Sequence, residues 1–100
     1  MPRPKPYRLH PKAWQEFEAA DDWYLSRSPD VSLAFLSDVY DALTTISESP
    51  HRWPKYLHGT RRFVIHRFPF SVIYLDDSEF VTIIAVSHSK RKPGYWRERL

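Results

Sequence analysis

Phe80-Val-Thr-Ile-Ile-Ala-Val-Ser87 is an apolar segment rich in β-branched residues, a composition typical of a strand that is buried in a sheet. It leads directly into His88-Ser-Lys-Arg-Lys-Pro-Gly-Tyr-Trp96, which is cationic, aromatic and turn-prone. This junction predicts a strand that ends at a surface able to bind an anionic partner. The alternative is that the cations form a solvated tail that keeps the chain soluble.

Two further strands are predicted before this segment, over residues 61–67 and 70–75. Pro69 separates them, because proline cannot donate a hydrogen bond within a sheet. Asp76-Asp-Ser-Glu79 supplies the turn that precedes the last strand, over residues 80–87. A short extended segment, Tyr7-Arg-Leu-His10, lies near the N-terminus, and residues 51–60 are predicted to form a loop anchored by Trp53.

The sequence between these segments predicts two amphipathic helices. The first covers about residues 12–25, where Pro11 suits the first turn and the apolar residues recur at helical spacing: Ala13, Trp14, Phe17, Ala20 and Tyr24. Asp30 or Ser32 can cap the second helix, whose apolar stripe consists of Leu36, Val39, Tyr40, Leu43 and Ile46. It ends before Pro50, because a residue that precedes proline is forced out of the α region.

The order of these elements predicts one α+β domain over residues 1–100. The connection between the helices is short, so they should form an antiparallel hairpin. We expect an N-terminal strand and a helical hairpin packed on one face of an antiparallel sheet, with the other sheet face partly open. A chain of 100 residues without cysteine can form one such core but has no disulfide or thiolate chemistry.

Charge is divided unevenly along the chain. Residues 1–12 carry a formal charge of +4, residues 13–49 carry −7, and residues 50–100 carry +6. The basic regions predict an anionic partner, either nucleic acid or an acidic protein segment. No segment is apolar and long enough to span a membrane, and the N-terminus has no apolar signal region, so we expect a cytoplasmic protein with no membrane partner.

Arg62 and His88 are the candidate catalytic residues. A nuclease that uses no metal needs proton transfer, for which histidine is suited, and it needs a cation that can bind phosphate oxygens in pairs, as arginine does. Alternation places Arg62, Val64 and His66 on one face of their strand, and in a three-stranded meander Arg62 and His88 could converge on the open face. The alternative is that both side chains are solvated or pair with nearby acids such as Asp76.

The remaining candidates form a set of cationic and aromatic residues suited to binding nucleic acid or another target: Arg61, Arg67, Lys90, Arg91, Lys92 and Tyr95. Trp96 is expected to fold back as a clasp on the core rather than to contact a ligand. No two histidines have the spacing of a metal site, and no glycine-rich phosphate loop is present. We therefore expect neither a metal nor another cofactor.

The chain resembles the RelE/ParE superfamily of bacterial type II toxins over nearly its whole length. The order and spacing of several short motifs carry the resemblance: Arg8-Leu-His-Pro-Lys-Ala13, Ala20-Asp-Asp-Trp-Tyr24, Ala34-Phe35, Ala42-Leu43-x-x-Ile46, Ser49-Pro50, Trp53-Pro54, Arg61-Arg62-Phe63, Phe68-Pro-Phe-x-Val-x-Tyr74 and Ile84-Ala-Val-x-His88-x-x-Arg91-x-Pro93. It implies a toxin with two helices against a sheet, neutralised by a cognate antitoxin that wraps it.

The superfamily resemblance implies one of two targets. ParE-like members inhibit DNA gyrase, whereas RelE-like members cleave mRNA on the ribosome without a metal, and there Arg62 would match a phosphate-stabilising arginine and His88 a proton-transfer histidine. The next position is often an aromatic catalytic residue in the nuclease branch, but it is Ser89 in this chain. The Arg-Phe-Pro-Phe segment and the Arg-x-Pro tail are more similar to the ParE side. We therefore expect a gyrase inhibitor, with a ribosome-dependent mRNA endonuclease as the alternative.

Overall fold

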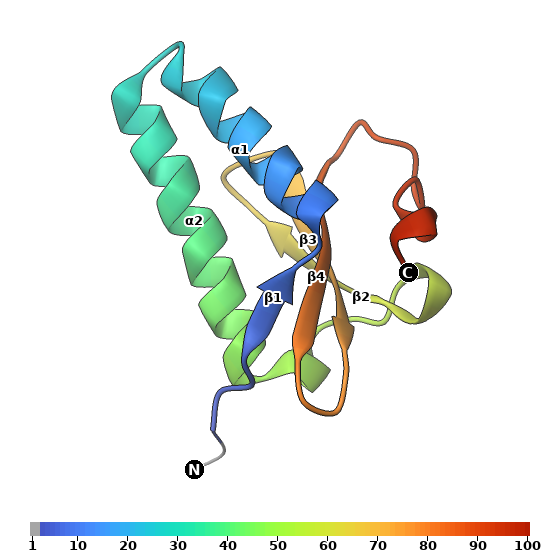
Figure 1. Ribbon diagram of the computed structural model, residues 1–100. Coiled ribbons are helices and arrows are strands. Elements are labelled where there is room, and N and C mark those ends of the chain that lie inside the picture. The colour runs from blue at the N-terminus through green and yellow to red at the C-terminus, as the bar shows by residue number, and fades with distance from the viewer. Residues whose placement is uncertain (1–2) are drawn as a thin grey trace.

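Strand β4 (Val81–His88) is the apolar segment, and it lies inside a four-stranded sheet with the order β1-β4-β3-β2. The computed structural model describes residues 3–100. The other strands are β1 (Tyr7–Leu9), β2 (Arg61–Ile65) and β3 (Phe70–Asp76). Helices α1 (Pro11–Leu25) and α2 (Pro29–Glu48) cover one sheet face as a hairpin (Figure 1). The predicted α+β architecture is confirmed.

Both helices begin at a proline whose preceding residue acts as the cap. The His10 side chain accepts a hydrogen bond from the backbone N–H of Lys12, and Ser28 accepts one from Val31. The prediction that Asp30 or Ser32 caps α2 is therefore wrong. Pro29 occupies the first helical position, where the backbone N–H that proline lacks would have no partner within the helix. The capping residue is therefore Ser28, which immediately precedes Pro29.

The sheet is mixed rather than purely antiparallel. Strands β2, β3 and β4 form the predicted antiparallel meander, but β1 pairs with β4 in parallel, with Tyr7 opposite Val81 and Leu9 opposite Ile83. The two helices carry the chain from β1, at one edge of the sheet, to β2, at the other edge. This crossover lets β1 and β4 run in the same direction, which the order of elements along the sequence does not reveal.

A β-bulge in β4 reverses the alternation of its side chains. Ile73 of β3 pairs with Ala85, whereas the next residue, Tyr74, pairs with Ile83, so Ile84 is an extra residue. The extra residue interrupts the alternation of side chains along the strand. Odd-numbered residues of β4 therefore face the helices before the bulge, and even-numbered residues face them after it. The consequence is that Val86 joins the buried cluster beneath the helices, while Ile84 and Ala85 both belong to the cluster on the opposite face.

The sheet has a buried cluster on each face. Under the helices the core is rich in aromatic and branched side chains, among them Phe17, Phe35, Val39, Leu43 and Tyr74. The other face, which we call the open face, carries a smaller cluster of Ile73, Ile84, Ala85 and Trp96. Trp96 is only 1% exposed, so the prediction that it clasps the core is confirmed. The C-terminal segment lies on the side of the sheet away from α2 (Figure 1).

Within residues 3–100, neither helix combines the length and the apolar character that crossing a membrane requires.

Candidate functional site

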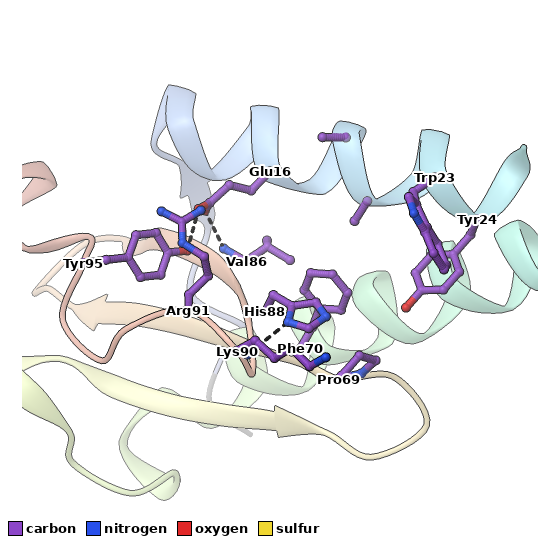
Figure 2. Close-up of a pocket in the computed structure, with 12 residues that line it drawn as sticks. Glu16, Trp23, Tyr24, Pro69, Phe70, Val86, His88, Lys90, Arg91 and Tyr95 are labelled. Carbon is purple, nitrogen blue, oxygen red and sulfur yellow. Dashed lines mark hydrogen bonds between the residues drawn. The ribbon is translucent and has the colours of Figure 1, made fainter.

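A groove of about 520 Å³ runs between helix α1 and the ends of strands β3 and β4 (Figure 2). Most of its lining is apolar or aromatic. Its rim at the end of β4 is formed by His88, Lys90 and Arg91, which are titratable or cationic. The groove is lined by Glu16, Ala19, Ala20, Trp23, Tyr24, Pro69, Phe70, Val86, His88, Lys90, Arg91 and Tyr95. Apolar walls with a few polar groups are typical of a binding site.

His88 is the last residue of β4, and its side chain lies on the helix side of the sheet. Its ring packs edge-on against Phe70, with the ring centroids 5.0 Å apart. The Nδ1 atom accepts a hydrogen bond of 3.0 Å from the backbone N–H of Lys90 (Figure 2). Since this bond occupies one ring nitrogen, only Nε2 is free to bind a partner or to exchange a proton.

Arg62 lies on the opposite face of the sheet from His88. Residues that pair across strands share a face, and Arg62 pairs with Ile73 of the open-face cluster, whereas His88 pairs with Phe70 beneath the helices. The Arg62 guanidinium stacks on the Tyr56 ring, 4.5 Å from its centroid. The bulge at Ile84 turns the His88 ring to the helix side, so the two side chains do not share the open face as expected, but both residues line one small cavity at the end of β4.

Two of the predicted cations are held by contacts within the chain. Arg67 donates two hydrogen bonds to Asp38 of α2, at 2.7 and 2.9 Å, and these bonds lower the pKa of that carboxyl group. Arg61 donates to the backbone oxygen of Trp53 at 2.7 Å. Arg61 links β2 to the loop before it and Arg67 links the turn after β2 to α2, which favours a structural role over target binding.

The cations after β4 remain exposed. Lys90, Arg91 and Lys92 are all exposed, and Arg91 stacks on the Tyr95 ring at 3.9 Å from its centroid. Lys90 and Arg91 line the groove. This part of the predicted binding set is brought together at one place on the surface.

The hydroxyl of Tyr95 is bound to Glu16 rather than directed at solvent. Glu16 accepts hydrogen bonds from Tyr95 Oη and from the backbone N–H of Val86 (Figure 2). It also accepts hydrogen bonds from both terminal nitrogens of Arg99, at 2.7 and 3.1 Å. Arg99 also donates to the backbone oxygen of Ile84. The pairing of β4 with β1 ends at Ile83. Beyond it, Glu16 and Arg99 provide hydrogen-bond partners for the backbone groups of Val86 and Ile84 on this edge of β4.

Glu16 and Arg99 are absent from the predicted site residues. The signal for Glu16 is its place on α1, because it precedes Ala20 by four residues and Trp23 by seven and thus shares their helix face. The sequence has no comparable signal for Arg99, which is 83 residues away from Glu16.

Burial raises the pKa of Tyr95 to about 12, and the hydrogen bond from its hydroxyl to Glu16 acts in the same direction. Burial likewise raises the pKa of Tyr74, whose hydroxyl donates to the backbone oxygen of Pro50. Both tyrosines therefore hold their protons more tightly in the folded chain than in the unfolded chain.

Alkaline pH is expected to destabilise the fold. Below pH 10 these tyrosines are protonated in both states, whereas above it the unfolded chain loses their protons first, so the melting temperature should fall steadily between pH 10 and 12. The Tyr95→Phe variant should show a shallower fall, measured by circular dichroism at a series of pH values. The exposed Tyr7→Phe is the matched control, and identical profiles for the two variants would contradict the prediction.

The helical hairpin on one face of this sheet is the fold of the RelE/ParE class of small toxins. A solved structure of the chromosomal ParDE TA system from P. aeruginosa has a similar fold, with a TM-score of 0.75 over 86% of this chain and 97% of that chain, at 17% sequence identity. The family model described as "ParE toxin of type II toxin-antitoxin system, parDE" matches residues 7–93. The chain belongs to this ParE toxin family. No curated protein matches it.

Proposed function

We propose that residues 1–100 form a single toxin domain that inhibits DNA gyrase in the cytoplasm and is neutralised by a cognate antitoxin. Membership of the ParE toxin family is the observation that carries the proposal. Inhibition by binding requires a shaped surface rather than a set of reacting groups. The groove beside α1 offers such a surface, with apolar walls and a cationic rim.

The placement of the candidate catalytic residues favours inhibition over RNA cleavage. A general acid or base must lie within hydrogen-bond reach of the group that it serves, and a phosphate-binding arginine must reach the same phosphate. The Arg62 side chain lies on the open face of the sheet and the His88 ring packs on Phe70 beneath the helices. Ser89, an alcohol at a position where the nuclease branch often has an aromatic residue, adds to this argument.

A supercoiling assay with purified gyrase tests the proposal. Toxin at about ten times its Kd for gyrase is expected to reduce the rate of DNA supercoiling by about tenfold, because mass action then leaves about a tenth of the enzyme unbound. Stalled ribosomes carrying mRNA should remain uncut in parallel. Unchanged supercoiling at a stoichiometric excess would contradict the proposal. Cleavage of the mRNA that is lost in Arg62→Ala and His88→Ala would instead support the endonuclease.

Neutralisation is tested with the protein encoded by the neighbouring reading frame. Co-expression should give a stable complex that restores supercoiling, and the complex should melt at a higher temperature, because a ligand that binds only the folded state stabilises it. Failure to form any complex would contradict the antitoxin part of the proposal while leaving the gyrase result standing.

A further inference from the structure

The helical hairpin has an unpartnered face on the side that is turned away from the sheet (Figure 1). Exposed residues recur at helical spacing along this side of both helices. The two rows meet at an aromatic cluster, in which the centroid of the Phe17 ring lies 5.7 Å from that of Trp14 and 5.5 Å from that of Tyr40. We call these exposed residues the outer hairpin face: Trp14, Glu18, Asp22 and Leu25 of α1, and Leu33, Ser37, Tyr40, Asp41 and Thr44 of α2.

Large apolar side chains are grouped on the outer hairpin face. Leu33 is 65% exposed, and Leu25, Tyr40 and Trp14 are exposed by 50%, 45% and 43%. Single exposed apolar residues are common on any protein, but a group of them on one face marks a site of contact with another molecule. Tyrosine and tryptophan are also enriched at the centres of protein interfaces.

The acidic residues of the hairpin are not balanced within the chain. Residues 13–49 carry a formal charge of −7, and Arg27, their one cation, stacks on the Trp23 ring at 3.6 Å from its centroid. Within residues 3–100, Glu16 and Asp38 are the hairpin acids that form ion pairs. The hairpin acids outside those pairs are Glu18, Asp21, Asp22, Asp30, Asp41 and Glu48.

This charge determines which class of partner the outer hairpin face can attract. Nucleic acids and the anionic leaflets of membranes both carry negative charge, so the face repels them. A protein with a cationic surface is attracted, and the exposed apolar side chains then add contact area between the charges. An enzyme that acts on DNA has such a surface, because lysine and arginine side chains neutralise the phosphates of the bound duplex.

We propose that the outer hairpin face docks on the cationic surface with which gyrase binds DNA, and thereby takes the place of the DNA. The inference rests on the proposed inhibition of gyrase and names the two surfaces that make the contact. Helix α1 separates this face from the groove, which Ala19 and Trp23 line from the other side of the helix. One large partner can therefore contact the face and the groove together.

Binding of the full-length, fluorescently labelled toxin to gyrase in the absence of DNA, measured by anisotropy, tests the acidic part of the face. The double variant Glu18→Gln/Asp22→Asn should bind about tenfold more weakly at low salt, because it removes two charges from the contact. The difference from the wild type should shrink as the salt concentration rises.

Glu79→Gln/Glu98→Gln is the matched control for this measurement. Glu79 and Glu98 are exposed, lie outside the hairpin and belong to no ion pair within residues 3–100, and their replacement changes the net charge by the same amount. The control should alter the affinity by less than about twofold, since its charges lie outside the contact. Equal affinities of the two double variants would overturn the outer hairpin face as the docking surface.

The apolar part of the face is tested with Leu33→Ser. This variant should weaken binding by about fivefold at every salt concentration, because salt does not screen an apolar contact. Val64→Ser is the control, since Val64 is 44% exposed but lies on β2, at the far edge of the sheet. Equal affinities of these two variants would show that the apolar residues of the face lie outside the contact and would overturn the proposal.

Competition with linear duplex DNA tests the surface of gyrase that is occupied. Added DNA should displace the labelled toxin, and the anisotropy should return to the value of the free toxin. A complex that DNA does not displace would overturn the inference even where the variants differ. If the wild-type chain neither binds gyrase nor inhibits supercoiling, the proposed function itself fails. Wild-type inhibition that persists unchanged in Glu18→Gln/Asp22→Asn would overturn this inference alone.

Discussion

Replacement of Trp96 by alanine is expected to lower the free energy of unfolding by about 3–5 kcal/mol, the range observed for the loss of a large buried aromatic side chain. Trp96 is 1% exposed and forms the open-face cluster with Ile73, Ile84 and Ala85. Its removal would leave a cavity that these neighbours cannot fill, because they are fixed in the sheet. Domains of this size are stable by only about 5–15 kcal/mol, so the C-terminal segment contributes a large share.

Urea unfolding followed by far-ultraviolet circular dichroism measures this effect. Trp23→Ala is the matched control, because Trp23 is 53% exposed and its loss should change the unfolding free energy by no more than about 0.5 kcal/mol. A loss below about 1 kcal/mol in Trp96→Ala would show that the open-face cluster does not support the fold.

The elements of this fold that depend on local sequence could be predicted from it. Periodicity and proline positions define the two helices, and the β-branched run defines β4, because these signals act within a few residues. The burial of Trp96 could also be predicted, since a tryptophan that follows a buried strand finds apolar area beside it. The parallel pairing of β1 with β4 could not, because it joins segments more than 70 residues apart.

The candidate site was harder to predict because one β-bulge in β4 determines on which face of the sheet the His88 side chain lies. In the sequence, Val81 to Ser87 has no glycine or proline that would mark Ile84 as an extra residue. Strict alternation would place His88 on the face that holds Ile84, and this is the open face that Arg62 shares. The bulge moves the His88 ring to the groove beside α1. One inserted residue therefore puts the His88 ring and the Arg62 side chain on different faces of the sheet, although both residues border the same small cavity at the end of β4.

The same bulge explains how the two surfaces of the protein differ. On the helix side, Val86 and His88 complete a groove with apolar walls, which suits a protein partner. On the open face, Ser87 lies opposite Ser71, and both residues line a smaller cavity together with Arg62.

Glu16→Gln is expected to lower the free energy of unfolding by about 2–3 kcal/mol, because a largely buried cation loses its partner. The Glu16 carboxylate accepts hydrogen bonds from both terminal nitrogens of Arg99. The Glu16 side chain is 17% exposed and the Arg99 side chain is 10% exposed. It also binds Tyr95 Oη and the N–H of Val86. Glutamine keeps the shape but brings an NH₂ group, a donor, to a site where the Arg99 guanidinium and the Val86 N–H can only donate, whereas the Tyr95 hydroxyl can turn to accept.

Equilibrium unfolding at neutral pH, combined with a double-mutant cycle, isolates this effect. Arg99→Met removes the cation but keeps the apolar stem, and the double variant Glu16→Gln/Arg99→Met should cost less than the sum of the single changes, because each single change leaves one charged partner without the other. Glu18→Gln is the control, since Glu18 lies on the same helix, is exposed and belongs to no ion pair within residues 3–100. Additive single effects, or a loss no larger than that of Glu18→Gln, would mean that the Glu16–Arg99 pair does not contribute to the stability of the fold.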